Sequence, residues 1–194
     1  MSLVEYNKIS NSDGAVSKLK TPEAQALAKG YIKLINSEKS VFVNVLKGDN
    51  ESTKTENSRV GSQFKGIDGS PSLIASMTGK QYDEFGGGVT SPVSSEGNYL
   101  VGIRMSTNGN TDYIDRTTGE TVQQPASGGE LSAHELLGHA LGGLSGFGTN
   151  FSNSIRVSNT YLRNTGSELY RNGTDHGGTM SEEEANAIPG YLIR

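Results

Sequence analysis

The chain has 194 residues, enough to bury the core of a single domain, and its composition is polar, with 26 glycines and only 32% hydrophobic residues. A net charge of −4, with no basic run and no apolar run long enough to span a membrane, argues against nucleic acid and membrane as partners. The absence of cysteine excludes disulfides and thiolate metal sites, so any metal must be held by His, Asp or Glu.

The first element that the sequence predicts is a helix. Residues 1–20 are polar and are expected to form a loose lead-in. Thr21 is a hydroxyl cap and Pro22 suits the first helical position, while Glu23 lies near the positive end of the helix dipole. A helix is therefore expected from here to about residue 36. Its expected buried stripe consists of apolar residues at steps of three and four: Ala24, Leu27, Tyr31 and Leu34.

Strands are predicted where β-branched and aromatic residues gather. Residues 40–47 (SVFVNVLK) form the first strand, and residues 98–106 (NYLVGIRMS) form a stronger one. Between them a long polar stretch predicts loop, with short strands near 63–66 and at 71–77. The turn-rich segment 107–129 predicts a hairpin or a loop that borders an active site.

Helices are predicted again in the last third of the chain. An apolar helix covers about 131–144 and contains two histidines, a second helix and turn fall within 152–171, and a short helix begins at Ser181. These elements indicate a single α+β domain over 1–194. The expected architecture is a small twisted sheet packed on the histidine helix, with a C-terminal glutamate helix crossing nearby.

The histidine helix contains the motif HELLGH, in which His134 and His139 are five positions apart. In a regular α-helix, residues four apart lie about 40° apart around the axis and residues five apart about 140°. The two imidazoles can therefore share a metal only if the helix absorbs one extra residue, as in a π-bulge. Gly138 tolerates such a backbone adjustment and is the predicted place where the helix yields.

The letters HELLGH resemble the zinc motif of the dipeptidyl peptidase III family, a group of gluzincin-type zinc metallopeptidases. The resemblance implies that His134 and His139 bind zinc and that Glu135 activates water. That family takes its third ligand from a downstream EExxA motif, which the segment EEANA fits. By this match Glu184 corresponds to the ligand, and Glu183 to a carboxylate that orients a histidine.

The resemblance covers only these two short segments, and members of the family are several times longer. It implies the metal site and the reaction type, but not the dipeptide-releasing specificity. The small size of the chain and its segments HALGG and YLRNTG…YRNGTDHGG resemble the compact zincin domains of bacterial secreted effectors and toxins. The resemblance implies a zincin-like fold for the α+β domain.

The residues also imply a mechanism on chemical grounds. Zn2+ held by His134, His139 and Glu184 would keep a fourth position open for water, lower the pKa of that water and polarise the scissile carbonyl. Glu135 would act as the general base and then donate a proton to the leaving amine. The developing oxyanion needs a further donor, for which His176 is the first choice. The other available donors are tyrosines: Tyr161, Tyr170 and Tyr191.

The third zinc ligand has alternatives within the sequence. Ser181 and Glu184 also have the pattern of a capping box, in which the glutamate reaches back to the cap. His176 is the next candidate, because the glycines of GTDHGG allow the backbone to approach a metal, and Asp175 and Glu183 follow. Four residues of the predicted second helix are interpreted as packing residues: Tyr161, Arg163, Tyr170 and Arg171.

The predicted function is zinc-dependent hydrolysis of peptide bonds in a peptide or protein substrate. Residues 98–106 are the predicted edge strand with which an extended peptide would pair. One alternative is a non-catalytic zinc-stabilised binding or effector module, which predicts a filled coordination shell and no cleft beside Glu135. Another is a zinc amidase acting on a cell-wall type substrate, which predicts a pocket lined by polar and aromatic groups.

The polar, cysteine-free composition is typical of a secreted or exported bacterial protein. The N-terminal residues lack the charged start and apolar stretch of a signal peptide, so a cytoplasmic location is the alternative to export.

Overall fold

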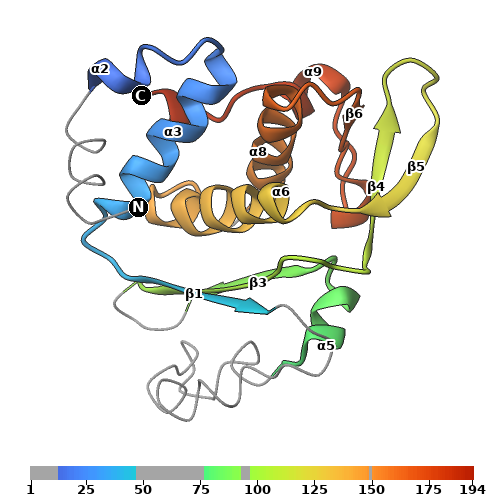
Figure 1. The fold of residues 1–194 in the computed structure, drawn as a ribbon, viewed down its shortest axis with the longest axis horizontal. Helices are drawn as coiled ribbons and strands as arrows, with labels where there is room; N and C mark the ends of the chain where they lie inside the picture. Colours follow the sequence, from blue (N-terminus) through green and yellow to red (C-terminus); the bar gives the residue numbers. More distant parts are fainter. Residues whose placement is uncertain (1–12, 47–76, 93–96, 149) are drawn as a thin grey trace.

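The computed structural model describes residues 13–46, 77–92, 97–148 and 150–194. In these ranges the chain has an α+β fold, with a layer of helices packed on a small sheet and a second small sheet beside it (Figure 1). The strand predicted near 63–66 lies outside the described residues, as does the strand predicted at 71–77 apart from Met77.

Within the described residues, the sheet beneath the helices has three strands in the order β1-β3-β2, formed by Val41–Leu46, Tyr99–Arg104 and Gly88–Pro92. The strand β3 runs parallel to β1 and antiparallel to β2. The strands predicted at 40–47 and 98–106 are confirmed as β1 and β3, while β2 was not predicted.

The prediction that 98–106 forms an edge strand is wrong, because β3 is the central strand and all six of its residues are buried. One face of β3 packs through Val101 and Ile103 against the helices, and the opposite face packs through Leu100 against Tyr82. A strand with apolar contacts on both faces needs a neighbour on both edges to satisfy its backbone groups as well. Among the described strands, the edge strand on the side of the histidine helix is β2.

The second sheet has the order β5-β4-β6, formed by Thr121–Pro125, Asn110–Asp115 and Leu169–Tyr170. The strands β4 and β5 pair antiparallel, so the hairpin predicted within 107–129 is confirmed.

The predicted N-terminal helix is α3 (Pro22–Ile35), and the Thr21 side chain accepts a hydrogen bond from the Ala24 N–H as its cap. Leu27 of the predicted stripe is buried, while Ala24, Tyr31 and Leu34 are partly buried. Two predicted helices near the C-terminus are confirmed as α8 (Phe151–Asn164) and α9 (Glu182–Asn186). Short helices that were not predicted are α2 (Asp13–Val16), α5 (Gly79–Glu84), η3 (Thr174–His176) and α10 (Gly190–Ile193).

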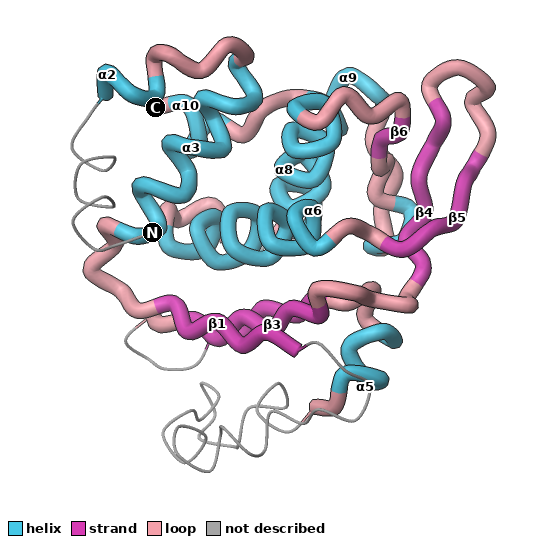
Figure 2. Tube along the Cα trace, in the orientation of Figure 1, coloured by secondary structure: helices cyan, strands magenta, loops and turns pink. Residues whose placement is uncertain are grey.

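The histidine helix is continuous over three segments, α6 (Gly128–Ser132), η2 (Ala133–Leu141) and α7 (Gly142–Leu144). It lies between the sheet and the other helices, with β1 and β3 on one side and α3 and α8 on the other (Figures 1 and 2). Leu137 faces the helix layer and Ala140 faces β3, and both are fully buried. Both faces of this helix are therefore held in place. Among the described residues, the helices are all too short or too polar to cross a membrane.

Candidate metal centre

The HELLGH segment forms a π-helix, η2, over nine residues from Ala133 to Leu141. A π-helix bonds residue i to residue i+5, so residues five apart come to lie on the same face. His134 and His139 accordingly face one another, with ring centroids 4.9 Å apart and planes at 75°. The prediction that this helix absorbs the extra residue by π geometry is confirmed.

Gly138 is required here for a different reason from the one that the sequence indicates. The π geometry extends over the whole segment rather than yielding at one residue. A Cβ on residue 138 would lie 2.5 Å from the Cα of Ser154, so Gly138 allows the backbone of α8 to approach η2 closely. Ser158 lies one turn further along α8, and its hydroxyl is hydrogen-bonded to Nδ1 of His134.

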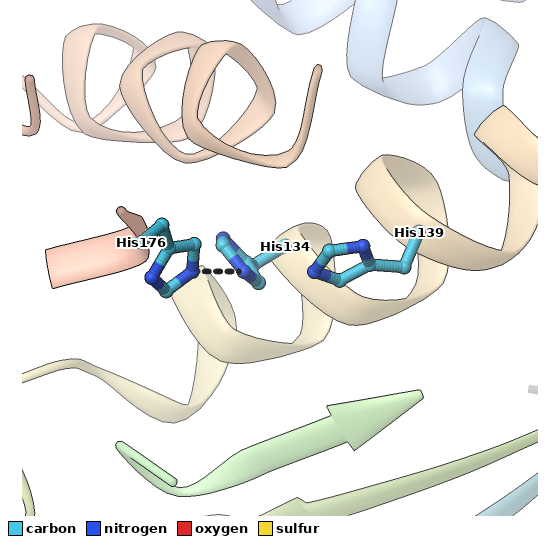
Figure 3. Close-up of side chains that lie close together, drawn as sticks. All are labelled: His134, His139 and His176. Carbon is cyan, nitrogen blue, oxygen red and sulfur yellow. Dashed lines mark hydrogen bonds between the residues drawn. The ribbon is translucent and has the colours of Figure 1, made fainter. Parts of the chain in front are cut away.

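The third histidine joins the other two from a distant part of the chain. Potential ligand atoms of His134, His139 and His176 all lie within 4.8 Å of one another, so the three side chains together can hold a metal ion (Figure 3). His176 ends the short helix η3, which is flanked by Gly173 and Gly177 with positive φ of 89° and 79°. Only glycine adopts this backbone readily, and it turns His176 toward η2.

The electrostatic environment keeps the imidazoles of His134 and His176 neutral, which is the form that binds a metal. Burial lowers the pKa of His134 well below its usual value, and the nearby charges of Arg171, His139 and His176 act in the same direction. Burial also lowers the pKa of His176, and Arg171 adds to the effect. The Nε2 atoms of His134 and His176 lie 3.2 Å apart, while Nδ1 of His134 lies 2.9 Å from the Ser158 hydroxyl.

Arg171 connects this cluster to two carboxylates. Its guanidinium donates to Asp175 Oδ2 at 2.6 Å and lies 3.9 Å from Glu130 Oε1, and its side chain is only 4% exposed. Glu130 is itself buried and accepts a hydrogen bond from Tyr113 at 2.9 Å. Burial raises the pKa of Glu130, although the positive charge of Arg171 opposes the shift.

Glu135 follows His134 in sequence, and its side chain points toward the strand β2. The Thr90 hydroxyl donates to its Oε2 at 2.6 Å, and the carboxylate packs against Gly88, where a Cβ would lie 2.6 Å from Oε1. Burial raises the pKa of Glu135 to about 7, against the opposing effects of the Thr90 hydrogen bond and of Arg171.

A pocket of about 580 Å³ opens over these groups. It brings the three histidines, Glu135 and Arg171 together with the edge strand β2 and two exposed aromatic side chains, Phe85 and Phe151. The tyrosines considered as oxyanion donors from the sequence are not among the described residues that line it: Tyr161, Tyr170 and Tyr191. The Tyr191 hydroxyl instead donates to the Leu137 carbonyl in the core.

Glu184 lies outside the histidine cluster. Its Oε2 accepts hydrogen bonds from the Ser181 N–H at 3.0 Å and the Ser181 hydroxyl at 2.9 Å, which is the capping box that the sequence also indicates. The bonds from Ser181 lower the pKa of this exposed carboxyl. Among the described residues, the three histidines form the only group of three or more potential metal ligands whose ligand atoms lie within 4.8 Å of one another, and Glu183 and Asp175 are outside it. The structure thus brings His176, rather than Glu184, to His134 and His139.

Three residues that contact the site were missed by the sequence analysis. Thr90 lies in a strand that was not predicted, and Ser158 is one of several serines in a polar helix. Arg171 was interpreted as a surface packing residue, yet it is buried. No local pattern distinguishes these three residues, because each reaches the site through the packing of an element distant in sequence.

Comparisons with models of protein families, with curated proteins and with solved structures find no match. Inferences about function therefore depend on the three histidines, Glu135 and the pocket around them.

Proposed function

We propose that this protein is a zinc metallopeptidase, in which His134, His139 and His176 hold the metal and Glu135 is the general base. One observation carries the proposal: the π-helix η2 turns both of its histidines toward His176 and presents Glu135 to the same pocket. Metal-dependent hydrolysis uses this combination: a set of metal ligands in an open cleft, and beside it a buried carboxylate whose pKa is raised.

The donor set fits zinc. Three imidazoles with no thiolate are a known ligand set for catalytic zinc, and they leave a fourth position open. His134 and His176 are held neutral by burial, and the Ser158 hydroxyl lies at Nδ1 of His134, so that Nε2 is the nitrogen available to a metal. Zinc bound there would supply the Lewis acid that lowers the pKa of a bound water and polarises a carbonyl.

Glu135 would move the protons. In the metal-free protein its pKa of about 7 lies near the pH at which a general base and acid works best. The Thr90 hydroxyl holds one carboxylate oxygen, which leaves the other to accept a proton from the attacking water and return it to the leaving amine. The close contact with Gly88 restricts the carboxylate to this position.

A peptide substrate is supported by the edge strand β2. This strand pairs with β3 on one side, and its residues Gly88, Val89 and Thr90 line the pocket beside Glu135. An extended peptide can pair with such a strand and place a carbonyl over the histidines. With a sheet, an edge strand and an active-site helix in this arrangement, we propose a zincin-like architecture.

The pocket also bears on the competing functions. A non-catalytic zinc module predicts no cleft beside Glu135, whereas Glu135 lines a pocket of about 580 Å³. A zinc amidase acting on a cell-wall type substrate is the second candidate, favoured by the exposed rings of Phe85 and Phe151 and by Asn110 in the pocket lining.

The proposal is tested by metal content and hydrolysis measured together. Mass spectrometry should find one zinc per chain in the wild type and in Glu135→Gln, and none in His139→Ala. The wild type should cleave members of a mixed peptide library, and Glu135→Gln should lose on the order of 100-fold or more in rate. No zinc uptake by the wild type would overturn the proposal. Zinc without peptide cleavage, but with release of amine from muropeptides, would favour the amidase.

A further inference from the structure

We propose that Arg171 keeps Asp175 out of the coordination shell of the metal, and so preserves the open position that catalysis needs. This inference rests on the proposed function, because it assigns a role within the same three-histidine site. Arg171 is a positioning residue in this scheme, since its effect on the coordination shell passes through Asp175. Its Nη1 also lies 3.3 Å from His134 Nδ1, on the side of the ring away from the proposed metal-binding Nε2.

The Arg171 guanidinium contacts both the carboxylate of Asp175 and the imidazole of the next residue, His176. Nη2 donates to Asp175 Oδ2 at 2.6 Å and lies 3.5 Å from His176 Nε2, the nitrogen that faces His134. Asp175 Oδ1 lies 3.6 Å from the other ring nitrogen, Nδ1 of His176. The carboxylate is therefore close to a candidate ligand, but it is bound to a cation.

This clamp is rigid and permanently charged. A guanidinium does not lose its proton in proteins, and its planar fork matches a carboxylate. Asn159 fixes the Arg171 main chain on both sides, accepting from its N–H at 2.7 Å and donating to its carbonyl at 2.8 Å. On the other arm, Nη1 lies 3.9 Å from the buried Glu130.

Zinc sites in proteins fall into two classes, and the number of protein ligands distinguishes them. Four protein ligands close a structural site, whereas catalytic sites have three and keep one position open. Aspartate is a zinc ligand, and Asp175 lines the same pocket as the histidines, so a free carboxylate here would compete for the fourth position. Paired with Arg171, its Oδ1 is held 3.6 Å from His176 Nδ1, and not at the Nε2 that faces His134.

The test compares Arg171→Met, Asp175→Asn and the double variant with the wild type. Arg163→Met is the matched control, because Arg163 is a partly buried arginine paired with Glu23 at 3.1 Å and does not line the pocket. Zinc affinity is measured by competition with a chromophoric chelator. The open position is measured from the visible spectrum of the Co2+-loaded protein, which added azide shifts only where it can bind the metal.

Arg171→Met should bind zinc about tenfold more tightly, because a cation is removed and a carboxylate is released toward the metal. It should also lose the azide response. The double variant should regain the azide-induced shift of the Co2+ spectrum. The single variants Asp175→Asn and Arg163→Met should show the same shift as the wild type. A purely structural role for Arg171 predicts the opposite sign, with weaker zinc binding that Asp175→Asn does not restore.

An azide response in Arg171→Met equal to that of the wild type would overturn this inference and leave the proposed function standing. A wild type that binds no metal would overturn both. If circular dichroism shows that Arg171→Met does not fold, Arg171→Gln is judged by the same criteria, because it keeps a polar side chain without the charge.

Discussion

The carboxylate of Glu135 lies against the main chain of Gly88, so closely that a Cβ at residue 88 would come within 2.6 Å of Oε1 and 2.7 Å of Cγ. The contact joins the histidine helix to the edge strand β2 at the point where a substrate strand would pair. The absence of a side chain at Gly88 is therefore a condition for the position of the proposed base.

Gly88→Ala should displace the Glu135 carboxylate and leave the three histidines in place. We expect the rate of peptide hydrolysis to fall on the order of 100-fold, because the base no longer reaches the attacking water, while zinc content stays at one per chain. Rate and zinc content are measured on the same preparation. Gly14→Ala is the control, since a Cβ there meets nothing within 4 Å. Unchanged hydrolysis in Gly88→Ala would contradict the role of Glu135.

His176→Ala and Glu184→Ala should separate the two candidates for the third ligand. His176 lies in the histidine cluster, so its removal should weaken zinc binding by on the order of 100-fold or more. Glu184 caps α9 from the surface, so Glu184→Ala should keep zinc affinity within about twofold of the wild type. Chelator competition measures both affinities. If Glu184→Ala weakened zinc binding and His176→Ala did not, the ligands would be those that the resemblance implies, with Glu184 as the third.

Gly138→Ala should destabilise the fold by about 1–3 kcal/mol, because the new Cβ would meet the Ser154 backbone at 2.5 Å and push α8 away from η2. Urea denaturation of the metal-free protein measures the free energy of unfolding. Gly178→Ala serves for comparison, since nothing lies within 4 Å of its Cβ position. Equal stability of the two variants would show that the approach of α8 to η2 is not tight.

Glu135→Gln should change how the stability of the metal-free protein depends on pH. Burial raises the pKa of Glu135 to about 7 in the folded state, above the usual 4.5. The folded state thus binds this proton more tightly than the unfolded state. The contribution of Glu135 is then most favourable below pH 4.5 and is lost as the pH rises through about 7, at a cost of up to about 3 kcal/mol.

Glutamine carries no charge at any pH, so Glu135→Gln should be more stable than the wild type at pH 8, and the difference should shrink toward pH 5. Thermal or urea unfolding in the presence of a chelator gives this difference. His134 and His176 act in the opposite direction, because their lowered pKa values make the folded state lose stability as the pH falls below 6.5. Both histidines are present in both proteins, so their contributions cancel. A constant difference across the pH range would contradict the raised pKa of Glu135.

Several local features of the fold were predictable because they depend on neighbours in sequence. The cap at Thr21 and the proline after it define the start of α3, and β-branched residues predict β1 and β3. The need for a π-helix follows from the five-residue spacing of His134 and His139 alone, and η2 meets it. The capping box at Ser181 was equally readable, but the sequence did not tell whether Glu184 serves the cap or a metal.

The sequence by itself determined the chemical content of this protein: three histidines, no cysteine, and two of those histidines with a glutamate on one helix that has to be a π-helix to bring them together. Only the tertiary structure decided which distant groups meet them. It brings His176 and not Glu184 to the cluster, makes β2 and not β3 the edge strand, and buries Arg171 beside the histidines. The physical reason is the separation in sequence of the residues involved. Caps and helical spacing follow from residues a few positions apart, whereas these tertiary contacts depend on how side-chain burial and backbone hydrogen bonding are satisfied across the whole fold.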